Sequence, residues 1–207
     1  MRVSKGEIFE RVFLDEPSLD LHIVQEEGSR VKIHILNFSS ATNRLTVEQT
    51  GHDCATEIYA LAYLHDADKV DTETHVTHRV GGGKSDQLIK FVLDDQAQGR
   101  FFGELKIDPD AQQVEAHQTN RNILLSDEAE MRTRPQLEIY ADDVQATHGA
   151  STGQLDNAAL FYMQQRGIGK QKARQLLVGA FMKDVLATIS DERLKEQLLN
   201  SIDGEVQ

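Results

Sequence analysis

The chain has 207 residues, with 34 acidic against 22 basic side chains and a formal net charge of −12. This balance argues against nucleic-acid binders, which neutralise phosphates with Lys and Arg, and against proteins that bind an anionic membrane surface. Because no apolar run is long enough for a membrane helix, no secretory signal opens the sequence and the one cysteine permits no intrachain disulfide, we expect a soluble, cytoplasmic protein.

Short strands are predicted one after another as far as about residue 145. β-branched and alternating residues mark segments 31–36, 45–48, 57–61, 70–76, 88–93, 101–107, 114–117, 123–125 and 137–139. No amphipathic helix of ordinary length interrupts them, which disfavours an α/β fold and leaves a sandwich, a barrel or a β-solenoid. Hairpin dipeptides Asn-Gly and Asp-Gly do not occur before residue 203, and several strands are apolar on both faces. These features favour a solenoid.

The segment 137–153 contains the final predicted strand and the residues that leave it. Its first eight residues alternate, with Leu137, Ile139 and Ala141 on one face, and its tail is small, polar and turn-forming. We therefore predict a last strand over 137–144 and a turn that holds His148. A neutral imidazole in such a turn is an effective iron or zinc ligand. A lone histidine in a turn is more often solvated or capping, so both interpretations stay open.

After Gly153 the hydrophobic period becomes helical, which predicts a β domain over 1–153 and a helical domain over 154–207. Gly167 is a plausible C-cap of the first helix. A second helix is expected from about residue 171 to 189, and a third starts at Ser190. The apolar stripe predicted for the second helix consists of Ala173, Leu176, Leu177, Ala180 and Phe181.

Two other motifs are weaker candidates for chemistry. Gly81-Gly-Gly-Lys-Ser85 lacks the earlier glycine of a phosphate loop, where His78 stands, and a strand follows it, so a plain turn is expected. His75 and His78 are three apart, which places their rings on opposite faces of a strand rather than at one metal.

The remaining candidates are a thiol and several carboxylates. Cys54, beside His52 and Asp53, is expected to be an ordinary buried or loop cysteine. Carboxylates such as Glu73 and Asp94 could in principle pair as in a glycosidase, but no spacing marks two of them out.

Several ordered motifs carry a family resemblance. They are Val-Asp-Thr-Glu-Thr-His-Val-Thr-His at 70–78, Ser-Asp-Gln-Leu at 85–88, Phe-Phe-Gly-Glu-Leu at 101–105, the segment 111–125, Pro-Gln-Leu-Glu-Ile-Tyr-Ala-Asp-Asp-Val at 135–144, His-Gly-Ala at 148–150 and Leu-Phe-Tyr-Met-Gln-Gln-Arg-Gly-Ile at 160–168. Together they resemble the SufB/SufD family of iron–sulfur cluster assembly proteins, and the His-Gly-Ala form is similar to its SufD branch. The resemblance implies a right-handed parallel β-helix, mainly β, followed by a small C-terminal helical domain. It also implies a scaffold component that is not an enzyme.

The resemblance further implies a complex with SufB and the ATPase SufC. The cluster would form transiently at the SufB–SufD interface, where His148 matches a functional histidine, and no stably bound cofactor is expected. The strand over 137–144 would lie at the SufB interface, and a free edge strand could also allow a homodimer when SufB is absent. The residues implied at the SufB interface are Leu137, Ile139, Tyr140 and Val144, and those implied for SufC docking are Leu160, Phe161, Tyr162, Arg166, Gly167 and Phe181.

Two departures from the family pattern keep alternatives open. Many SufD proteins have a cysteine two residues before this histidine, where the present chain has Ala146. Family members are also commonly longer, which leaves open a natural short form or a piece of a longer protein. The alternatives to a cluster scaffold are a carbohydrate-active β-solenoid enzyme and a purely structural adaptor without cluster contact.

Overall fold

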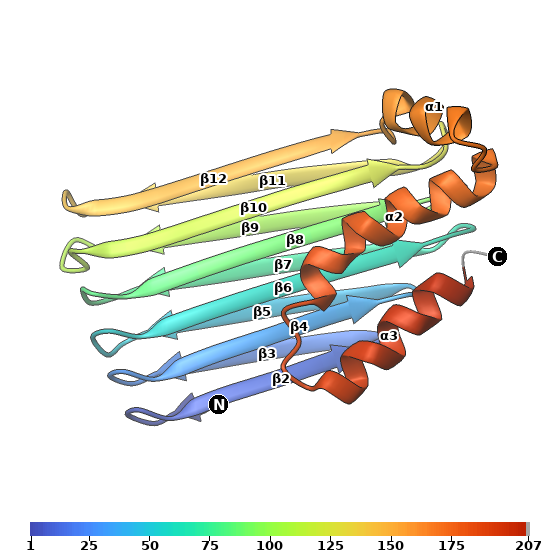
Figure 1. Cartoon of the computed structure of the whole chain (residues 1–207). Helices are drawn as coiled ribbons and strands as arrows, with labels where there is room; N and C mark the ends of the chain where they lie inside the picture. The colour runs from blue at the N-terminus through green and yellow to red at the C-terminus, as the bar shows by residue number, and fades with distance from the viewer. Residues whose placement is uncertain (206–207) are drawn as a thin grey trace.

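The computed structural model describes the backbone of residues 1–205 and the side chains of residues 1–200. Within this part, a parallel β-solenoid is followed by helices, which confirms the predicted fold class (Figure 1). Residues 206–207, the end of the helical segment predicted over 154–207, lie outside the described residues.

Successive strands alternate between two parallel sheets, so each coil of the chain contributes one strand to each sheet. In Figure 1 the strands of the front sheet run to the right and those behind return to the left, which makes a right-handed coil. Sheet A contains β1 (Arg2–Val3), β3 (Ser18–Gln25), β5 (Ala41–Gln49), β7 (Lys69–His78), β9 (Gln98–Ile107) and β11 (Glu130–Ile139). Sheet B contains β2 (Ile8–Leu14), β4 (Arg30–Asn37), β6 (Ala55–Leu64), β8 (Lys84–Leu93), β10 (Val114–Leu124) and β12 (Val144–Gly153).

The core lies between the two sheets. Every second residue of a strand faces inward, and parallel register stacks equivalent residues of neighbouring coils into columns. One such column in sheet B runs from Ile33 through Ile58 to Gln87 and Gln118. The first two members of this column, Ile33 and Ile58, belong to one continuous buried apolar cluster with Leu45, Val47 and their neighbours.

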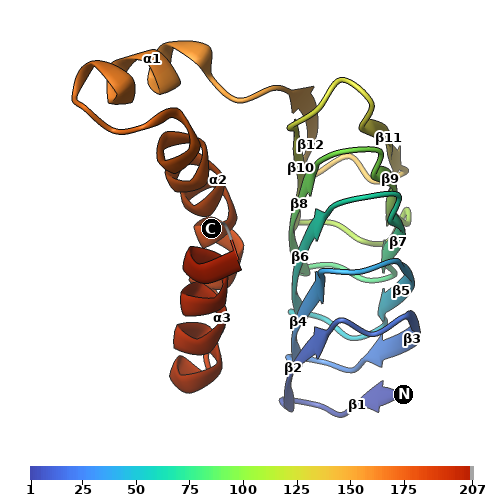
Figure 2. The same cartoon turned by 90° about the vertical axis from the view of Figure 1, so that its right-hand side faces the viewer.

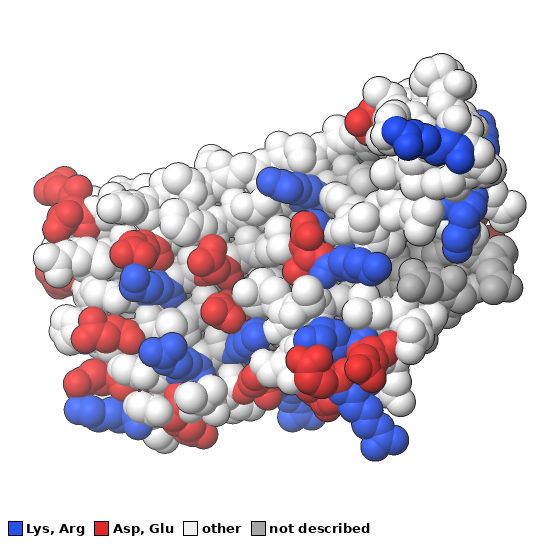
Figure 3. Space-filling model, in the orientation of Figure 1, with Lys and Arg blue, Asp and Glu red and all other residues white. Residues whose placement is uncertain are grey.

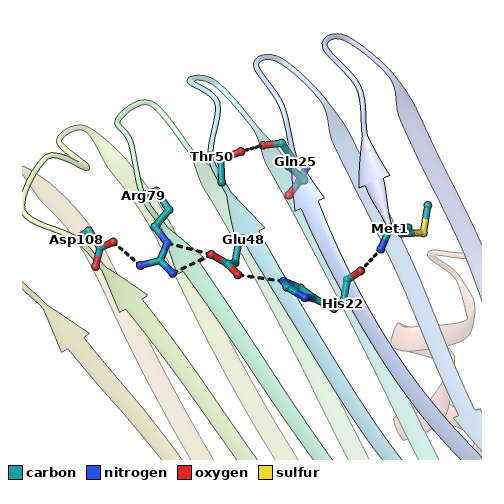
Figure 4. Close-up of polar contacts among 7 residues, drawn as sticks. All are labelled: Met1, His22, Gln25, Glu48, Thr50, Arg79 and Asp108. Carbon is teal, nitrogen blue, oxygen red and sulfur yellow. Dashed lines mark hydrogen bonds and ion pairs between the residues drawn. The ribbon is translucent and has the colours of Figure 1, made fainter.

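The outer face of sheet A is polar and carries cross-strand ion pairs (Figure 4). Arg79 on the loop after β7 lies 2.8 Å from Glu48 and 2.9 Å from Asp108, and His22 lies 3.0 Å from Glu48. Hydrogen bonds from Arg79, and less so from His22, hold the pKa of Glu48 below its usual value. These contacts therefore bridge consecutive coils on the solvent side.

Three helices lie after the solenoid in the described residues: α1 (Asn157–Gln165), α2 (Lys170–Leu186) and α3 (Glu192–Glu205). Figure 2 shows α2 and α3 along the outer face of sheet B, with α1 set away from it. Gly167 has a positive φ of 83° just past the end of α1, as expected for a C-terminal glycine. None of the helices in the described part is long and apolar enough to cross a membrane.

The buried face of α2 differs from the predicted stripe. Leu176 and Ala180 are exposed, and the buried residues are Ala173, Val178, Gly179, Met182, Val185 and Leu186. Of these, Val178, Met182, Val185 and Leu186 pack on an apolar patch outside sheet B that includes Leu36, Leu61 and Val92. The helix has apolar residues on more than one side, so the sheet rather than the periodicity selects the face.

Buried polar contacts hold α2 to the sheet. Lys90 on β8 is 1% exposed, and its Nζ donates to the carbonyl of Phe181 at 2.7 Å and to Asp184 at 2.5 Å. Arg174 donates to Asp94 at 2.7 Å and to the carbonyl of Leu125, just after β10, at 3.1 Å. The helix is therefore linked to two adjacent strands of sheet B.

Two predicted strand boundaries are wrong. The segment 137–144 is not one strand, because β11 ends at Ile139, residues 140–143 turn the corner, and β12 begins at Val144. Segments 114–117 and 123–125 largely belong to one strand, β10. Its polar middle faces inward, where Asn120 and Asn122 hydrogen-bond each other at 2.7 and 3.0 Å. The polar residues of this buried amide pair were therefore interpreted as a break between two strands.

Candidate functional site

Sheet B ends in a strand without the usual protection of an edge. β12 lies at the edge of sheet B, at the same end of the solenoid as β11, the edge of sheet A. Its sequence, Val-Gln-Ala-Thr-His-Gly-Ala-Ser-Thr-Gly, contains no charged residue and no proline. In Figure 3 the surface along β12 is mainly uncharged, with acidic groups at its left end. Native edges are commonly blocked by charges or proline, so this edge is suited to pairing with another strand.

The neighbouring edge strand, β11, has the opposite character. It contains Pro135, which lacks a backbone N–H, together with Glu130, Arg132, Arg134 and Glu138. The side chain of Arg132 is largely exposed. Of the two strands at this end, β12 is therefore the better template for strand addition.

His148 lies in the middle of β12 and not in a turn, which corrects the sequence prediction. Gly149 and Ala150 suggested a turn, but both continue the strand in register with β10. His148 pairs with Gln118, a residue that is 1% exposed and faces the interior. Register partners on parallel strands point to the same side. The imidazole therefore lies on the inward side of the last coil, and it is exposed at the open end of the solenoid.

Ala146 lies two residues before His148 and on the same side of β12. It pairs with the buried Ala116 and is itself half-buried. A cysteine at this position would stand beside the imidazole on one face of the strand. The present chain offers only a methyl group there.

The residue beneath His148 has unsatisfied polar atoms. Neither Oε1 nor Nε2 of Gln118 has a hydrogen-bond partner in the described part of the chain. Across the interior lies Gly103 of β9, where an added Cβ would come within 2.4 Å of that Nε2. Gln87, one coil further in, accepts from the hydroxyl of Thr74 at 2.8 Å.

A complete metal site is not present in residues 1–200. No three His, Cys, Asp or Glu side chains among the described residues come together closely enough to hold an ion. Since iron in proteins needs several donors, a site at His148 requires ligands from another molecule.

The comparison with protein families decides where the chain belongs. Residues 19–181 match the family model described as SUF system FeS cluster assembly, SufBD core domain. The chain belongs to the SufB/SufD family.

Individual members of the SufB/SufD family support the assignment. The iron–sulfur cluster assembly protein SufD of Escherichia coli K12 is 32% identical over 183 residues, which are 88% of this chain and 43% of that protein. An iron–sulfur cluster assembly SufBD family protein of Synechocystis is 34% identical over 178 residues, 85% of this chain and 39% of that protein. The chain spans less than half the length of these curated relatives. It is a SufD-like protein of the SUF iron–sulfur cluster assembly system.

The SufB-contact residues implied by family resemblance gather at the corner between the last two strands. Leu137 and Ile139 close β11, Tyr140 lies in the turn and Val144 opens β12. Leu137 and Val144 pack against the core, whereas Ile139 and Tyr140 are exposed. The corner and the free edge of β12 form one continuous end of the SufB/SufD-type solenoid.

Most of the SufC-docking residues implied by the family lie on α1. Phe161 is 62% exposed and Tyr162 59% exposed, while Leu160 is half-buried. Arg166 donates to the Tyr162 hydroxyl at 2.8 Å and ends the helix before Gly167. None of the residues of α1 is buried.

Phe181 does not join the α1 surface. It is half-buried on α2, and its ring lies 4.4 Å from Nζ of Lys90. Phe181 therefore helps to hold α2 against sheet B.

The weaker candidates have structural roles. His75 contacts Glu104 at 3.1 Å on the outer face of β7, and His78 contacts Ser85 at 2.9 Å inside, which confirms the opposite-face prediction. Gly82, with φ of 76°, forms a turn before β8. Glu73 lies against Arg44 and Arg100.

Cys54 is buried, as expected, and its Sγ lies 3.1 Å from the carbonyl of Glu26. Sequence reasoning missed Gln87 and Gln118. Their signal was a polar residue at every second position, as in Gln118-x-Asn120-x-Asn122, where a solenoid strand normally places aliphatic residues.

Proposed function

We propose that this SufB/SufD-family chain is a non-catalytic part of the scaffold on which iron–sulfur clusters are assembled. It pairs with SufB through β12, docks the ATPase SufC through α1, and presents His148 to the cluster between the two chains. The observation that carries the proposal is an uncharged, unblocked edge strand with a histidine at its centre.

Strand addition at β12 explains how SufB would bind. A partner strand beside β12 extends sheet B, and main-chain hydrogen bonds supply affinity without requiring charged side chains. His148 then lies between two stacked coils, on the side that faces the shared interior. The partner supplies the remaining donors, since no three His, Cys, Asp or Glu side chains of the described residues come together to hold an ion.

The helices supply the link to the ATPase. α1 exposes Phe161 and Tyr162, aromatic residues of the type that anchor protein interfaces. α2 follows directly and is held to β8 by Lys90 and to the end of β10 by Arg174. β10 pairs with β12 along its length. Movement of a docked ATPase would therefore reach the strand that carries His148.

The cluster role is tested by His148→Ala in the complex with SufB and SufC from the same organism. The matched control is Thr147→Ala, since Thr147 is the preceding residue on the opposite side of β12. We expect the His148 variant to form the complex but to lose roughly tenfold in iron and acid-labile sulfide. Unchanged iron and sulfide would refute the ligand role.

Edge pairing is tested by Ala150→Lys, with Ser151→Lys as the control. Ala150 pairs with the inward-facing Asn120, so a lysine there would stand where a partner coil stacks. Ser151 pairs with the exposed Arg121 on the other side. Co-purification of SufB should be lost with the first variant and kept with the second. Equal retention would exclude pairing at this coil.

SufC docking is tested by the double variant Phe161→Ala, Tyr162→Ala. Leu176→Ala on α2 is the control, because Leu176 is another exposed apolar residue of the helical segment. Loss of SufC with retention of SufB is expected for the double variant alone. SufC binding that survives it would place the docking surface elsewhere.

Ala146 favours a second candidate, a structural adaptor without cluster contact. A methyl group stands where many relatives of the SufD branch have a thiol, so the chain offers fewer donors to a cluster. An adaptor would lose cluster content through the α1 variant and keep it in His148→Ala. The same set of variants therefore separates the two candidates.

A further inference from the structure

The buried side-chain amide of Gln118 makes no contact in the free chain that accounts for a polar residue at this position. The side chain is 1% exposed, and neither its oxygen nor its nitrogen finds a partner among the described residues. A buried polar group without a partner costs free energy, and an apolar side chain of similar volume would avoid that cost. Two coils earlier in the same column, the equivalent position is occupied by an aliphatic residue, Ile58.

The opposite sheet leaves room for this amide. Gly103 of β9 faces it, and any Cβ at Gly103 would lie 2.4 Å from Nε2 and 2.8 Å from the amide carbon of Gln118. The amide therefore crosses the interior at a height where the facing strand has no side chain in its way. Two residues on different strands combine to place an amide at this point.

The amide of Gln118 also belongs to a column of polar side chains that runs toward the open end. Thr74 donates to Oε1 of Gln87 at 2.8 Å, Gln87 pairs in register with Gln118, and Gln118 pairs with His148. Adjacent strands are about 4.8 Å apart, so a change of side-chain rotamer can bring an amide and an imidazole in register to hydrogen-bond distance, although no hydrogen bond joins Gln118 to His148 in the free chain. The column leads to the exposed imidazole at the open end.

We propose that Gln118 is a positioning residue for His148. When a partner coil covers the open end, Oε1 of Gln118 accepts a hydrogen bond from one ring N–H of His148. This bond fixes the neutral tautomer and turns the lone pair of the other ring nitrogen toward the incoming iron. Ligand histidines almost always donate their second N–H to such an acceptor. The inference rests on the proposed function, because it assumes that His148 is a ligand.

The test compares Gln118→Leu with Gln87→Leu in the complex with SufB and SufC. Both variants remove one buried amide from the same column, but only the first removes the neighbour of His148. The first readout is the nitrogen chemical shifts of His148 in the ¹⁵N-histidine-labelled complex, with His148→Ala to assign them. The second is the iron content of the complex.

In the parent complex and in Gln87→Leu we expect one neutral tautomer of His148. In Gln118→Leu we expect a mixture of tautomers and roughly tenfold less iron, with the complex still formed. A single unchanged tautomer in Gln118→Leu would overturn the proposal. If His148→Ala itself left the iron content unchanged, the proposed function would fail first, so the two failures are distinguishable.

Discussion

One column of sheet B buries different side chains in the early and the late coils of the solenoid. In one column of sheet B, the early strands place Ile33 and Ile58 in the interior, whereas the late strands place Gln87, Gln118 and finally His148. The backbone ladders are the same in both regions, so the sheet does not depend on which side chains face inward. Along this column the interior changes from aliphatic to polar toward the open end, whereas in sheet A the column from Gln25 through Gln49 and His78 to Ile107 changes the other way.

Polar residues in the late coils are of two kinds. Asn120 and Asn122 satisfy each other at 2.7 and 3.0 Å, and Asn122 also donates to the carbonyl of Ser151 on β12. Gln118, one step earlier on the same face of β10, has no partner in the described part of the chain. A paired amide serves stability, whereas an amide without a partner calls for a functional explanation.

The largest effect should come from giving an early coil the residue of a late one. Ile58→Gln would remove an aliphatic side chain with no exposed surface and bury an amide among Ile33, Ala60 and Val47. We expect a loss of about 4 kcal/mol in the free energy of unfolding, from lost packing and an unsatisfied amide together. Urea denaturation of the chain measures it. A loss below about 1 kcal/mol would mean that this apolar position of the early coils tolerates a buried amide as well.

The free energy of unfolding should fall at low pH, because two buried histidines resist protonation in the folded chain. Burial lowers the pKa of His78 inside the solenoid to about 4, and burial with the nearby Lys32 lowers that of His34 under α2 to about 4. In the unfolded chain both titrate near 6.5. Between these values the unfolded state binds more protons, so stability is full above pH 6.5 and falls as the pH is lowered toward 4.

Between pH 7 and pH 5 each histidine should account for roughly 2 kcal/mol of that loss. Urea unfolding at pH 7 and pH 5 tests it, because above pH 5 the lowered pKa of Glu48 contributes little. His78→Leu should remove about half of the pH dependence. A variant with the parent's full dependence would show that His78 is not the titrating group.

A smaller effect is expected from closing the space that Gly103 leaves open. In Gly103→Ala the new Cβ would lie 2.4 Å from the Gln118 amide and 2.6 Å from the ring of Phe101, so at least one must shift. We expect a loss of about 2 kcal/mol. Gly153→Ala, with no atom within 4 Å of the new Cβ, should change little.

A double variant sharpens this result. In a Gln118→Ala background, Gly103→Ala should cost about 1 kcal/mol less, because only the Phe101 contact remains. Strict additivity in the unfolding measurements would mean that the two residues do not share the space.

The solenoid itself could be predicted from the sequence, because strands apolar on both faces and the lack of hairpin dipeptides disfavour antiparallel sheets. The strand boundaries of the last coil could not be predicted from the sequence. Leu137, Ile139 and Ala141 alternate without a break, yet Ala141 is buried in the corner after β11 and not in a strand. Burial at a corner and burial in a strand leave the same pattern in the sequence.

His148 was predicted as a site only through family resemblance, since residue types alone favoured a solvated or capping histidine. Gln118 was missed because its neighbours in space, Gln87 and His148, are about 30 residues away in each direction, one coil apart. Register between coils cannot be read from a sequence without a crisp repeat. The apolar face of α2 was placed on Leu176 instead of Met182 for a different reason, namely that the helix has apolar residues on more than one side.

The smallest effect on stability should come from Gln118→Leu, the reverse of the Ile58 exchange in the same column. Replacing an amide without partners by an aliphatic group of similar volume removes a desolvation cost and adds apolar burial. We expect the free energy of unfolding to stay within about 1 kcal/mol of the parent or to rise. A loss of 3 kcal/mol or more in urea denaturation would mean that the amide is already satisfied in the free chain. The late coils would then differ from the early ones in composition but not in what their polar groups do for the fold.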